Sequence, residues 1–255
     1  MTRSIAFANQ KGGVAKTTSV AALAAAFAEQ GSSVLVVDLD PQASLTYSLG
    51  VDGDELAATV HDVLVDGRPV DDVIVAEADH GVDLVPANID LAGAEAQLLT
   101  RPGREYGLRR ALRPVVDNYD FVLVDCPPSL GILTINALTA VDEVIIPLQC
   151  ETLGLRGVGL LLETIADVRE FTNADLAVTG VVATMFDART NLAHEVLARV
   201  REDHGLSVIG PPVPKSVRAA EAPGVGRSVL GHASSSKPAA AYREVAAALL
   251  ARGDA

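Results

Sequence analysis

Short apolar runs rich in valine and isoleucine alternate with stretches of helical periodicity along the whole chain. Seven runs are expected to be strands: "SIAFAN", "SSVLVVD", "VDLVPA", "DFVLVD", "DEVIIPL", "LAVTGVVATM" and "LSVIG". Helices are expected near residues 16–30, 56–65, 90–99, 103–118, 130–140, 153–172, 190–204 and 236–252. Because the runs are continuously apolar, both sheet faces must be covered by helices. The pattern predicts one α/β domain over residues 1–255, a three-layer sandwich with a mostly parallel twisted sheet.

Composition narrows the class of protein further. The hydrophobic content of 49% and charged content of 21% are ordinary for a globular core. No apolar run approaches the ~18 residues that span a bilayer, and no signal-peptide segment precedes the first strand, so we expect a cytoplasmic protein. Cys126 and Cys150 lie far apart in strand-like sequence, which favours buried thiols over a disulfide or metal site.

The net charge of −13 argues against a nucleic-acid partner when it is taken globally. Its distribution is uneven, because residues 1–184 carry 11 Lys and Arg against 26 Asp and Glu, whereas residues 185–255 carry 9 against 7. A surface that binds phosphate is therefore expected in the last third of the chain. The most acidic block, residues 51–83, is interpreted as a solvated helical insertion.

The stretch "NQKGGVAKTT", residues 9–18, lies between the first strand and the first helix. Such a turn directs free backbone N–H groups toward one point, where the helix dipole also favours an anion. The phosphate-loop pattern is incomplete, since Gln10 and Ala15 replace its two glycines, but Lys16 and Thr17 stand at the expected offset. Taken alone, the stretch is either a phosphate loop or a glycine-rich turn of purely structural use.

Ala15, which replaces the second glycine of the phosphate-loop pattern, affects the backbone energy of the loop. One methyl group is tolerated there if φ is negative and helical, whereas a positive φ costs a non-glycine residue about 1–2 kcal/mol. We expect the helical conformation at this position.

Carboxylates follow two strands that end near this loop. Asp38 and Asp40 end one strand, and Asp125 ends another after four apolar residues. The carboxyl ends of parallel strands form the ligand-binding edge of such sheets, and Mg²⁺ prefers oxygen ligands. Each acid alone could cap the next helix, but the three together indicate a magnesium and phosphate site.

With Lys11 five residues before Lys16, and with "DLDPQ" and "DCPP" downstream, the chain resembles the deviant Walker A ATPases of the ParA/MinD family. The segments "TMFDART", "PKSVRAAEAPGVGRSV" and "NIDLAGAE" are similar to those of the chromosomal, Soj-like ParA branch. The resemblance covers essentially the whole chain and implies a P-loop NTPase fold with ATP and Mg²⁺ as cofactors.

The resemblance also implies roles for residues. In this family ATP drives a sandwich homodimer, in which Lys11 would reach the partner's phosphates and Asp40 would help to position the attacking water, with Lys16 as the other catalytic cation. Thr17 would bind Mg²⁺, with Asp38 and Asp125 in its water shell. The nucleotide-binding residues implied are Lys11, Gly12, Gly13, Val14, Ala15, Lys16, Thr17 and Thr18, with Met185 and Pro214 at the adenine.

Soj-like relatives hold double-stranded DNA non-specifically through arginines, and the matching positions are Arg189 and Arg218. The alternative is that these arginines only pair with nearby Asp187 and Glu221. Plasmid-type relatives carry an N-terminal helix-turn-helix extension, and we expect none because the loop strand begins at residue 4. The terminal stretch "AAAYREVAAALLARGDA" has no large aromatic apart from a tyrosine, which favours packing on the domain over membrane docking.

The sequence thus predicts a nucleoid-associated ATPase that is released from DNA after hydrolysis, with a ParB-like activator and with chromosome partition or cargo positioning as its task. Because of Ala15, a nucleotide-gated switch with little hydrolysis remains an alternative. A positioning role like that of MinD is the third reading.

Overall fold

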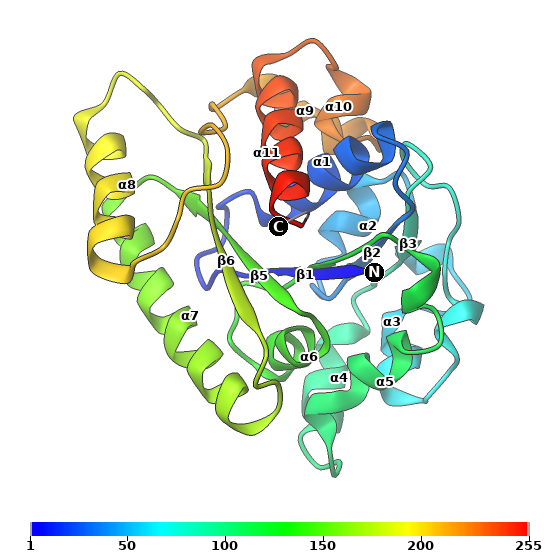
Figure 1. Ribbon diagram of the computed structural model, residues 1–255. Helices are drawn as coiled ribbons and strands as arrows, with labels where there is room; N and C mark the ends of the chain where they lie inside the picture. Colours follow the sequence, from blue (N-terminus) through cyan, green and yellow to red (C-terminus); the bar gives the residue numbers. More distant parts are fainter. Residues whose placement is uncertain (1, 254–255) are drawn as a thin grey trace.

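The computed structural model describes residues 2–253, so residues 1, 254 and 255 of the expected domain lie outside it. Six parallel strands form one sheet in the order β3-β2-β4-β1-β5-β6 (Figure 1). The strands are β1 (Arg3–Phe7), β2 (Val34–Asp38), β3 (Asp83–Val85), β4 (Phe121–Asp125), β5 (Glu143–Gln149) and β6 (Ala177–Thr184). The predicted three-layer α/β fold is confirmed.

Helices cover both faces of this sheet (Figure 1). One face carries α1 (Lys16–Glu29), α2 (Ser44–Ser48), α9 (Val217–Glu221), α10 (Val229–His232) and α11 (Lys237–Gly253). The other face carries α3 (Val60–Val65), α4 (Leu91–Leu98), α5 (Gly107–Leu112), α6 (Ile132–Ala140), α7 (Thr152–Phe171) and α8 (Asn191–His204). Short 3₁₀ turns lie between them: η1 (Gly53–Glu55), η2 (Val70–Asp72), η3 (Arg104–Tyr106), η4 (Val116–Asn118) and η5 (Ala222–Val225).

The sheet separates two hydrophobic cores. Along β1, Ile5 and Phe7 belong to the core with α1 and α11, whereas Ala6 belongs to the core with α3 to α8. This division follows from the two-residue period of a strand. Both cores draw on continuous apolar strands, as the sequence pattern indicated.

Two expectations about elements were wrong. The seventh strand, expected at 206–210, forms only an isolated parallel bridge between Val208 and Val181, because the chain turns away at Gly210 with φ 61°. The helix expected over 103–118 is instead η3, α5 and η4, and α5 ends two residues before Pro114, a residue that cannot continue a helix hydrogen-bond ladder. The short helices α2, α9 and α10 were not predicted.

Helix α11 packs on α1 through a buried tyrosine. Tyr242 is 1% exposed, and its hydroxyl lies 3.0 Å from Ser19 Oγ. At the rim, Arg243 donates two hydrogen bonds to Glu29, at 2.6 and 2.8 Å. The expectation that the terminal helix packs on its own domain is confirmed over the described residues. Within residues 2–253, no helix combines the length and apolarity needed to cross a membrane.

Candidate functional site

The loop between β1 and α1 lies at the carboxyl edge of the sheet, and its backbone is left-handed at two positions. Gly13 has φ 72°, and Ala15, directly before α1, has φ 61° and ψ 37°. The expected helical φ at Ala15 was therefore wrong. The left-handed conformation is used because residue 15 must reverse the chain at the helix entrance, and a non-glycine residue there carries strain of about 1–2 kcal/mol.

Hydrogen bonds to the carbonyl oxygens hold this loop in place. Thr184 Oγ1, at the end of β6, donates to the Val14 carbonyl at 2.9 Å. Ser19 donates to the Ala15 carbonyl twice, from its backbone N–H at 3.0 Å and from Oγ at 2.7 Å. These bonds offset the strain at Ala15. They leave the first N–H groups of α1, which have no partner within a helix, at the cavity described next.

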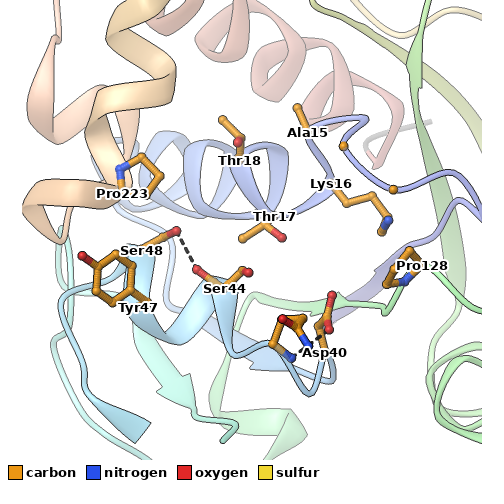
Figure 2. Close-up of a pocket in the computed structure, with 13 residues that line it drawn as sticks. Ala15, Lys16, Thr17, Thr18, Asp40, Ser44, Tyr47, Ser48, Pro128 and Pro223 are labelled. Carbon is orange, nitrogen blue, oxygen red and sulfur yellow. Dashed lines mark hydrogen bonds between the residues drawn. The ribbon is translucent and has the colours of Figure 1, made fainter. Parts of the chain in front are cut away.

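A cavity of about 450 Å³ opens at the N-terminus of α1 (Figure 2). It is lined by six of the residues expected to bind nucleotide, by Asp40, and by residues that sequence reasoning missed. The missed residues are Ser44, Tyr47 and Ser48 of α2, Gln42 before it, Pro128 after β4 and Pro223 of η5. Helix α2 has only five residues, too few for a helical period to be visible in sequence.

Thr17, which lines this cavity, is hydrogen-bonded to the buried carboxylate of Asp125, which is not among the lining residues. Thr17 Oγ1 donates to Asp125 Oδ2 at 2.6 Å, and Asp125 Oδ1 is buried with no hydrogen-bond partner among the described residues. Burial, with the nearby Asp38 carboxylate, raises the pKa of Asp125 well above its usual value. Burial also lowers the pKa of Lys16, which is 7% exposed, against the opposing effect of Asp125. An unsatisfied buried oxygen beside a threonine hydroxyl fits a hydrated divalent cation.

Asp38 is engaged in the protein's own hydrogen bonds. Its Oδ2 accepts from Thr46 N at 2.9 Å and Thr46 Oγ1 at 2.8 Å, and its Oδ1 accepts from Asp40 N at 3.1 Å. Burial raises the pKa of Asp38 to about 6, against the lowering effect of these bonds. Asp38 pairs with Asp125 across β2 and β4. This placement suits a water-mediated rather than a direct contact with a metal.

The Lys11 ammonium is paired with side chains of its own subunit. Its Nζ is 2.7 Å from Glu151 Oε2 and 3.3 Å from Gln149 Oε1. Glu151 precedes α7 and Gln149 ends β5. Sequence reasoning did not identify either partner.

The two residues expected at the adenine are neighbours but lie apart from the cavity's lining. Met185 follows β6 with φ 47°, and the next residue, Phe186, forms a parallel bridge with Pro214. Neither Met185 nor Pro214 is among the residues that line the cavity. Their role in adenine binding stays a prediction.

The arginines expected to contact DNA are exposed but paired. Arg189 Nη2 lies 2.7 Å from Asp187 Oδ2, and Arg218 Nη1 lies 3.1 Å from Glu221 Oε2. Their side chains are 88% and 66% exposed. Both ion pairs are those named as the alternative to DNA contact. The hydrogen bonds from Arg189 lower the pKa of Asp187 to about 2.

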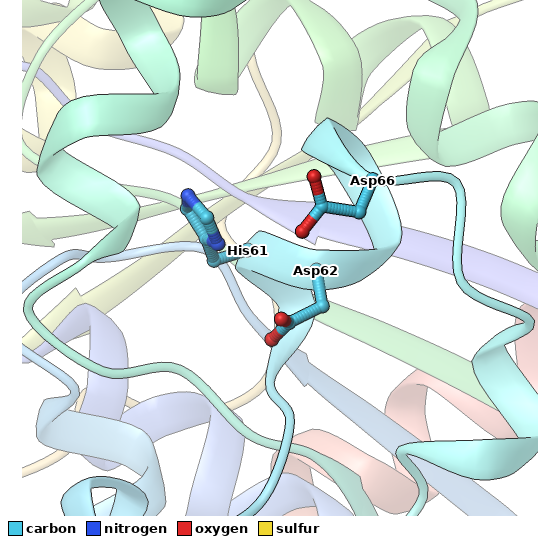
Figure 3. Close-up of side chains that lie close together, drawn as sticks. All are labelled: His61, Asp62 and Asp66. Atoms are coloured by element: carbon cyan, nitrogen blue, oxygen red, sulfur yellow. The ribbon is translucent and has the colours of Figure 1, made fainter.

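Outside the cavity, Figure 3 shows His61 and Asp62 of α3 close to Asp66, the residue that follows this helix. Their side-chain ligand atoms lie within 4.8 Å of one another. Asp62 Oδ2 accepts a hydrogen bond from Thr59 N at 2.7 Å as part of a capping box. The cluster is explained by helix capping and by spacing on one short helix.

Comparison with known proteins identifies a matching family model and similar proteins. A family model described as "AAA domain" matches residues 2–178. The sporulation initiation inhibitor protein Soj of Bacillus subtilis (strain 168) is 44% identical over 253 residues, which is 99% of this chain and 100% of Soj. The chromosome partitioning protein ParA of Myxococcus xanthus (strain DK1622) is 41% identical over 250 residues, covering 98% of this chain and 88% of ParA.

A solved structure agrees over the whole chain. It is the crystal structure of cobyrinic acid a,c-diamide synthase from Mycobacterium smegmatis with bound ADP and magnesium. The TM-score is 0.89 at 50% identity, covering 100% of this chain and 96% of that one. A second structure of that protein holds an ATP analogue and magnesium.

The parallel sheet, the loop before α1 and the carboxylate at the end of β4 together define a P-loop nucleotide-binding fold. Within that class, the chain belongs to the ParA/MinD family of ATPases, in its chromosomal, Soj-like branch.

Proposed function

We propose that this protein is a ParA-type ATPase that binds Mg²⁺-ATP in the cavity at the N-terminus of α1. The observation that carries the proposal is the buried, unpartnered Asp125 Oδ1 beside a Thr17 hydroxyl. Leaving a buried carboxylate oxygen without a partner is costly. A cation with its water shell would satisfy it.

The chain's own residues suit triphosphate binding. The free amides of the first turn of α1 would donate to phosphate oxygens, and the buried Lys16 ammonium would lie along the β- and γ-phosphates. Thr17 would exchange its bond to Asp125 for a bond to the metal, while Asp125 and Asp38 would hold the metal's water ligands. Mg²⁺ there would neutralise charge that develops on the phosphates during hydrolysis.

Hydrolysis would depend on dimer formation. Lys11 would supply a positive charge across a sandwich dimer, as an arginine finger does in other phosphoryl-transfer enzymes. Asp40, which lines the cavity, would orient the attacking water. The lifetime of the dimer would then be set by hydrolysis.

The ATP-bound dimer would hold double-stranded DNA non-specifically through Arg189 and Arg218 and leave it after hydrolysis. Four arginines per dimer give a weak, salt-sensitive grip, which suits a protein of net charge −13. A ParB-like activator would stimulate release, and the nucleoid would be the place of action. The ParA relative of Myxococcus xanthus is named a chromosome partitioning protein, which supports this assignment.

A second function is favoured by one observation, the left-handed alanine at φ 61°. If its methyl group obstructs the hydrolytic geometry, the protein is a nucleotide-gated switch with little turnover. ATP consumption above background in the presence of DNA and a candidate partner supports the enzyme. Nucleotide-dependent dimerisation without turnover supports the switch.

The name of the Mycobacterium smegmatis relative raises amide synthesis as a further activity. It supports nucleotide binding, but glutamine-dependent amidation uses a reactive thiolate to release ammonia. Cys126 and Cys150 are both buried, and burial raises the pKa of both thiols, that of Cys150 to about 11. Neither buried thiol has the character of a reactive thiolate, so we favour the partitioning ATPase.

The test of the site compares an asparagine variant of Asp125, which ends β4, with one of Asp120, which directly precedes β4. Asp125→Asn should weaken magnesium-dependent ATP binding by at least tenfold in calorimetry. Asp120→Asn, at an exposed position, should bind as the wild type does. Equal magnesium-dependent affinity in all three proteins would refute the assignment of Asp125.

A further inference from the structure

Lys11 is held by two side chains of its own subunit. Its ammonium lies 2.7 Å from Glu151 Oε2 and 3.3 Å from Gln149 Oε1. Gln149 Nε2 also donates to Glu151 Oε1 at 2.7 Å, so the carboxylate is fixed from both sides. As a result, the Lys11 side chain is only 26% exposed.

The backbone of the loop is attached to the same strand. Asn9 Nδ2 donates to the Pro147 carbonyl of β5 at 2.8 Å, and Asn9 Oδ1 accepts from Lys11 N at 2.9 Å. The residue that carries the ammonium is thus tied to β5 through its main chain as well as through its side chain.

Two glycines let the first turns of α7 lie close to their neighbours, Gly157 to the loop and Gly154 to the end of β5. A Cβ at Gly157 would lie 3.2 Å from Asn9 Oδ1 and 3.9 Å from Lys11 N. A Cβ at Gly154 would lie 2.8 Å from the Gln149 carbonyl. This close approach places Glu151 over Lys11, so the ion pair follows from backbone packing and not only from the reach of two long side chains.

We propose that Glu151 is a positioning residue for Lys11, which it holds on its own subunit until phosphate displaces the carboxylate. The inference rests on the proposed function, in which Lys11 meets a triphosphate in the dimer. To reach a phosphate across the dimer, the Lys11 ammonium would have to leave Glu151 of its own subunit. Formation of the dimer therefore requires exchange of one anion for the other at each of two lysines.

The exposure of the Lys11–Glu151 ion pair determines how strongly it opposes dimer formation. Glu151 is 52% exposed, and exposed ion pairs typically change an equilibrium by a factor of roughly 1.4 to 5. Since two pairs must open per dimer, their combined effect is the square of that factor, on the order of tenfold. A pair of this strength delays dimer formation without preventing it.

The first experiment measures the pair in the nucleotide-free protein, where dimer formation plays no part. The amine of Lys11 is labelled with acetic anhydride at low reagent concentration. The acetylation of Lys11 is then quantified by mass spectrometry relative to that of Lys215. Glu151→Gln should label Lys11 about threefold faster, because it loses the carboxylate that covers the ammonium. Glu151→Asp, which keeps the charge, should restore part of the protection.

The second experiment measures ATP-dependent dimerisation by sedimentation. Glu151→Gln should lower the dimer dissociation constant about tenfold. Glu163→Gln makes the same change at an exposed position of α7, and it should behave as the wild type does.

The outcomes separate the two proposals. Unchanged Lys11 labelling in Glu151→Gln overturns the pairing. Faster labelling with unchanged or weaker dimerisation overturns its control of the dimer. If the wild type does not dimerise with ATP, the proposed function fails and the control of the dimer fails with it, while the labelling result still decides whether Glu151 holds Lys11.

Discussion

Replacing Ala15 by glycine removes one methyl group from a residue whose backbone is left-handed. With φ 61° and ψ 37°, Ala15 lies where an L-residue with a Cβ is disfavoured by about 1–2 kcal/mol. Glycine adopts this conformation freely, but it also gives the unfolded chain more freedom, at a cost of about 0.4–1 kcal/mol. The difference predicts that Ala15→Gly raises the free energy of unfolding by about 0.7 kcal/mol.

Two other alanines make matched controls for this prediction. Ala43, which precedes α2, has φ 51° and lies outside the phosphate loop, so Ala43→Gly should give a similar gain. Ala166 lies exposed inside α7, where glycine costs about 1 kcal/mol. The measurement is urea unfolding of all three variants without nucleotide. If Ala15→Gly is as destabilising as Ala166→Gly, residue 15 is not left-handed in solution and the reasoning is refuted.

The same variant also tests whether Ala15 limits nucleotide binding. If the loop keeps its conformation when ATP binds, the strain is present in both states and cancels, so the dissociation constant should change by less than tenfold. A much larger gain in affinity would show that the methyl group itself obstructs the phosphates. In that case the switch, rather than the ATPase, describes the native protein.

Three further predictions concern other parts of the molecule. The pKa of Asp38 is raised by burial to about 6 from an unfolded value near 4, so the folded state binds its proton more tightly. Its contribution to stability is therefore complete below pH ~4 and is lost as pH rises to about 6. In urea unfolding, the free energy of unfolding of the wild type minus that of Asp38→Asn should fall by roughly 2–3 kcal/mol across this range. A difference that does not change with pH would contradict the burial argument. Thr184→Val removes the donor to the Val14 carbonyl and should cost about 1–3 kcal/mol in the same assay; a smaller loss means that the loop does not depend on this bond. Charge reversal at Arg189 and Arg218 should abolish ATP-dependent DNA retention while sparing nucleotide affinity, and the wild-type slope of log K against log salt should be about −3.6; retained DNA binding would refute the assignment.

The architecture could be predicted because local pattern and burial agree along most of the chain. Continuous apolarity in "VLVVD" and "FVLVD" identified β2 and β4, and their terminal acids, Asp38 and Asp125, lie side by side in the sheet. Two of the failures, α2 and the expected strand at 206–210, are segments in which periodicity has too few residues to be seen. Helix α2 has five residues, and the segment at 206–210 has the composition of a strand but pairs only at Val208.

The positions of candidate site residues could be predicted where they follow from the residue's place on a helix or strand. Lys16 and Thr17 begin α1, so their position was determined by the strand-turn-helix pattern. The conformation of Ala15 could not be predicted, because it depends in part on a distant residue: Thr184 on β6 holds the carbonyl of Val14, 170 residues away in sequence. The partners of Lys11 were missed for the same reason, since Glu151 lies 140 residues away in sequence.

The three cations proposed to bind phosphate at the surface are all in ion pairs with carboxylates. Lys11, Arg189 and Arg218 are each paired with a carboxylate of their own chain, within 2.7 to 3.1 Å. Phosphate binding at these positions would therefore be an exchange of anions, and its free energy would be the difference between two ion pairs rather than the full strength of one. Lys16 is different, because it is buried against Asp125 and does not depend on exchange with solvent-exposed acids. This contrast predicts tight nucleotide binding at the loop together with weak, reversible contacts at the surface, which is the combination that a cycle of binding and release requires.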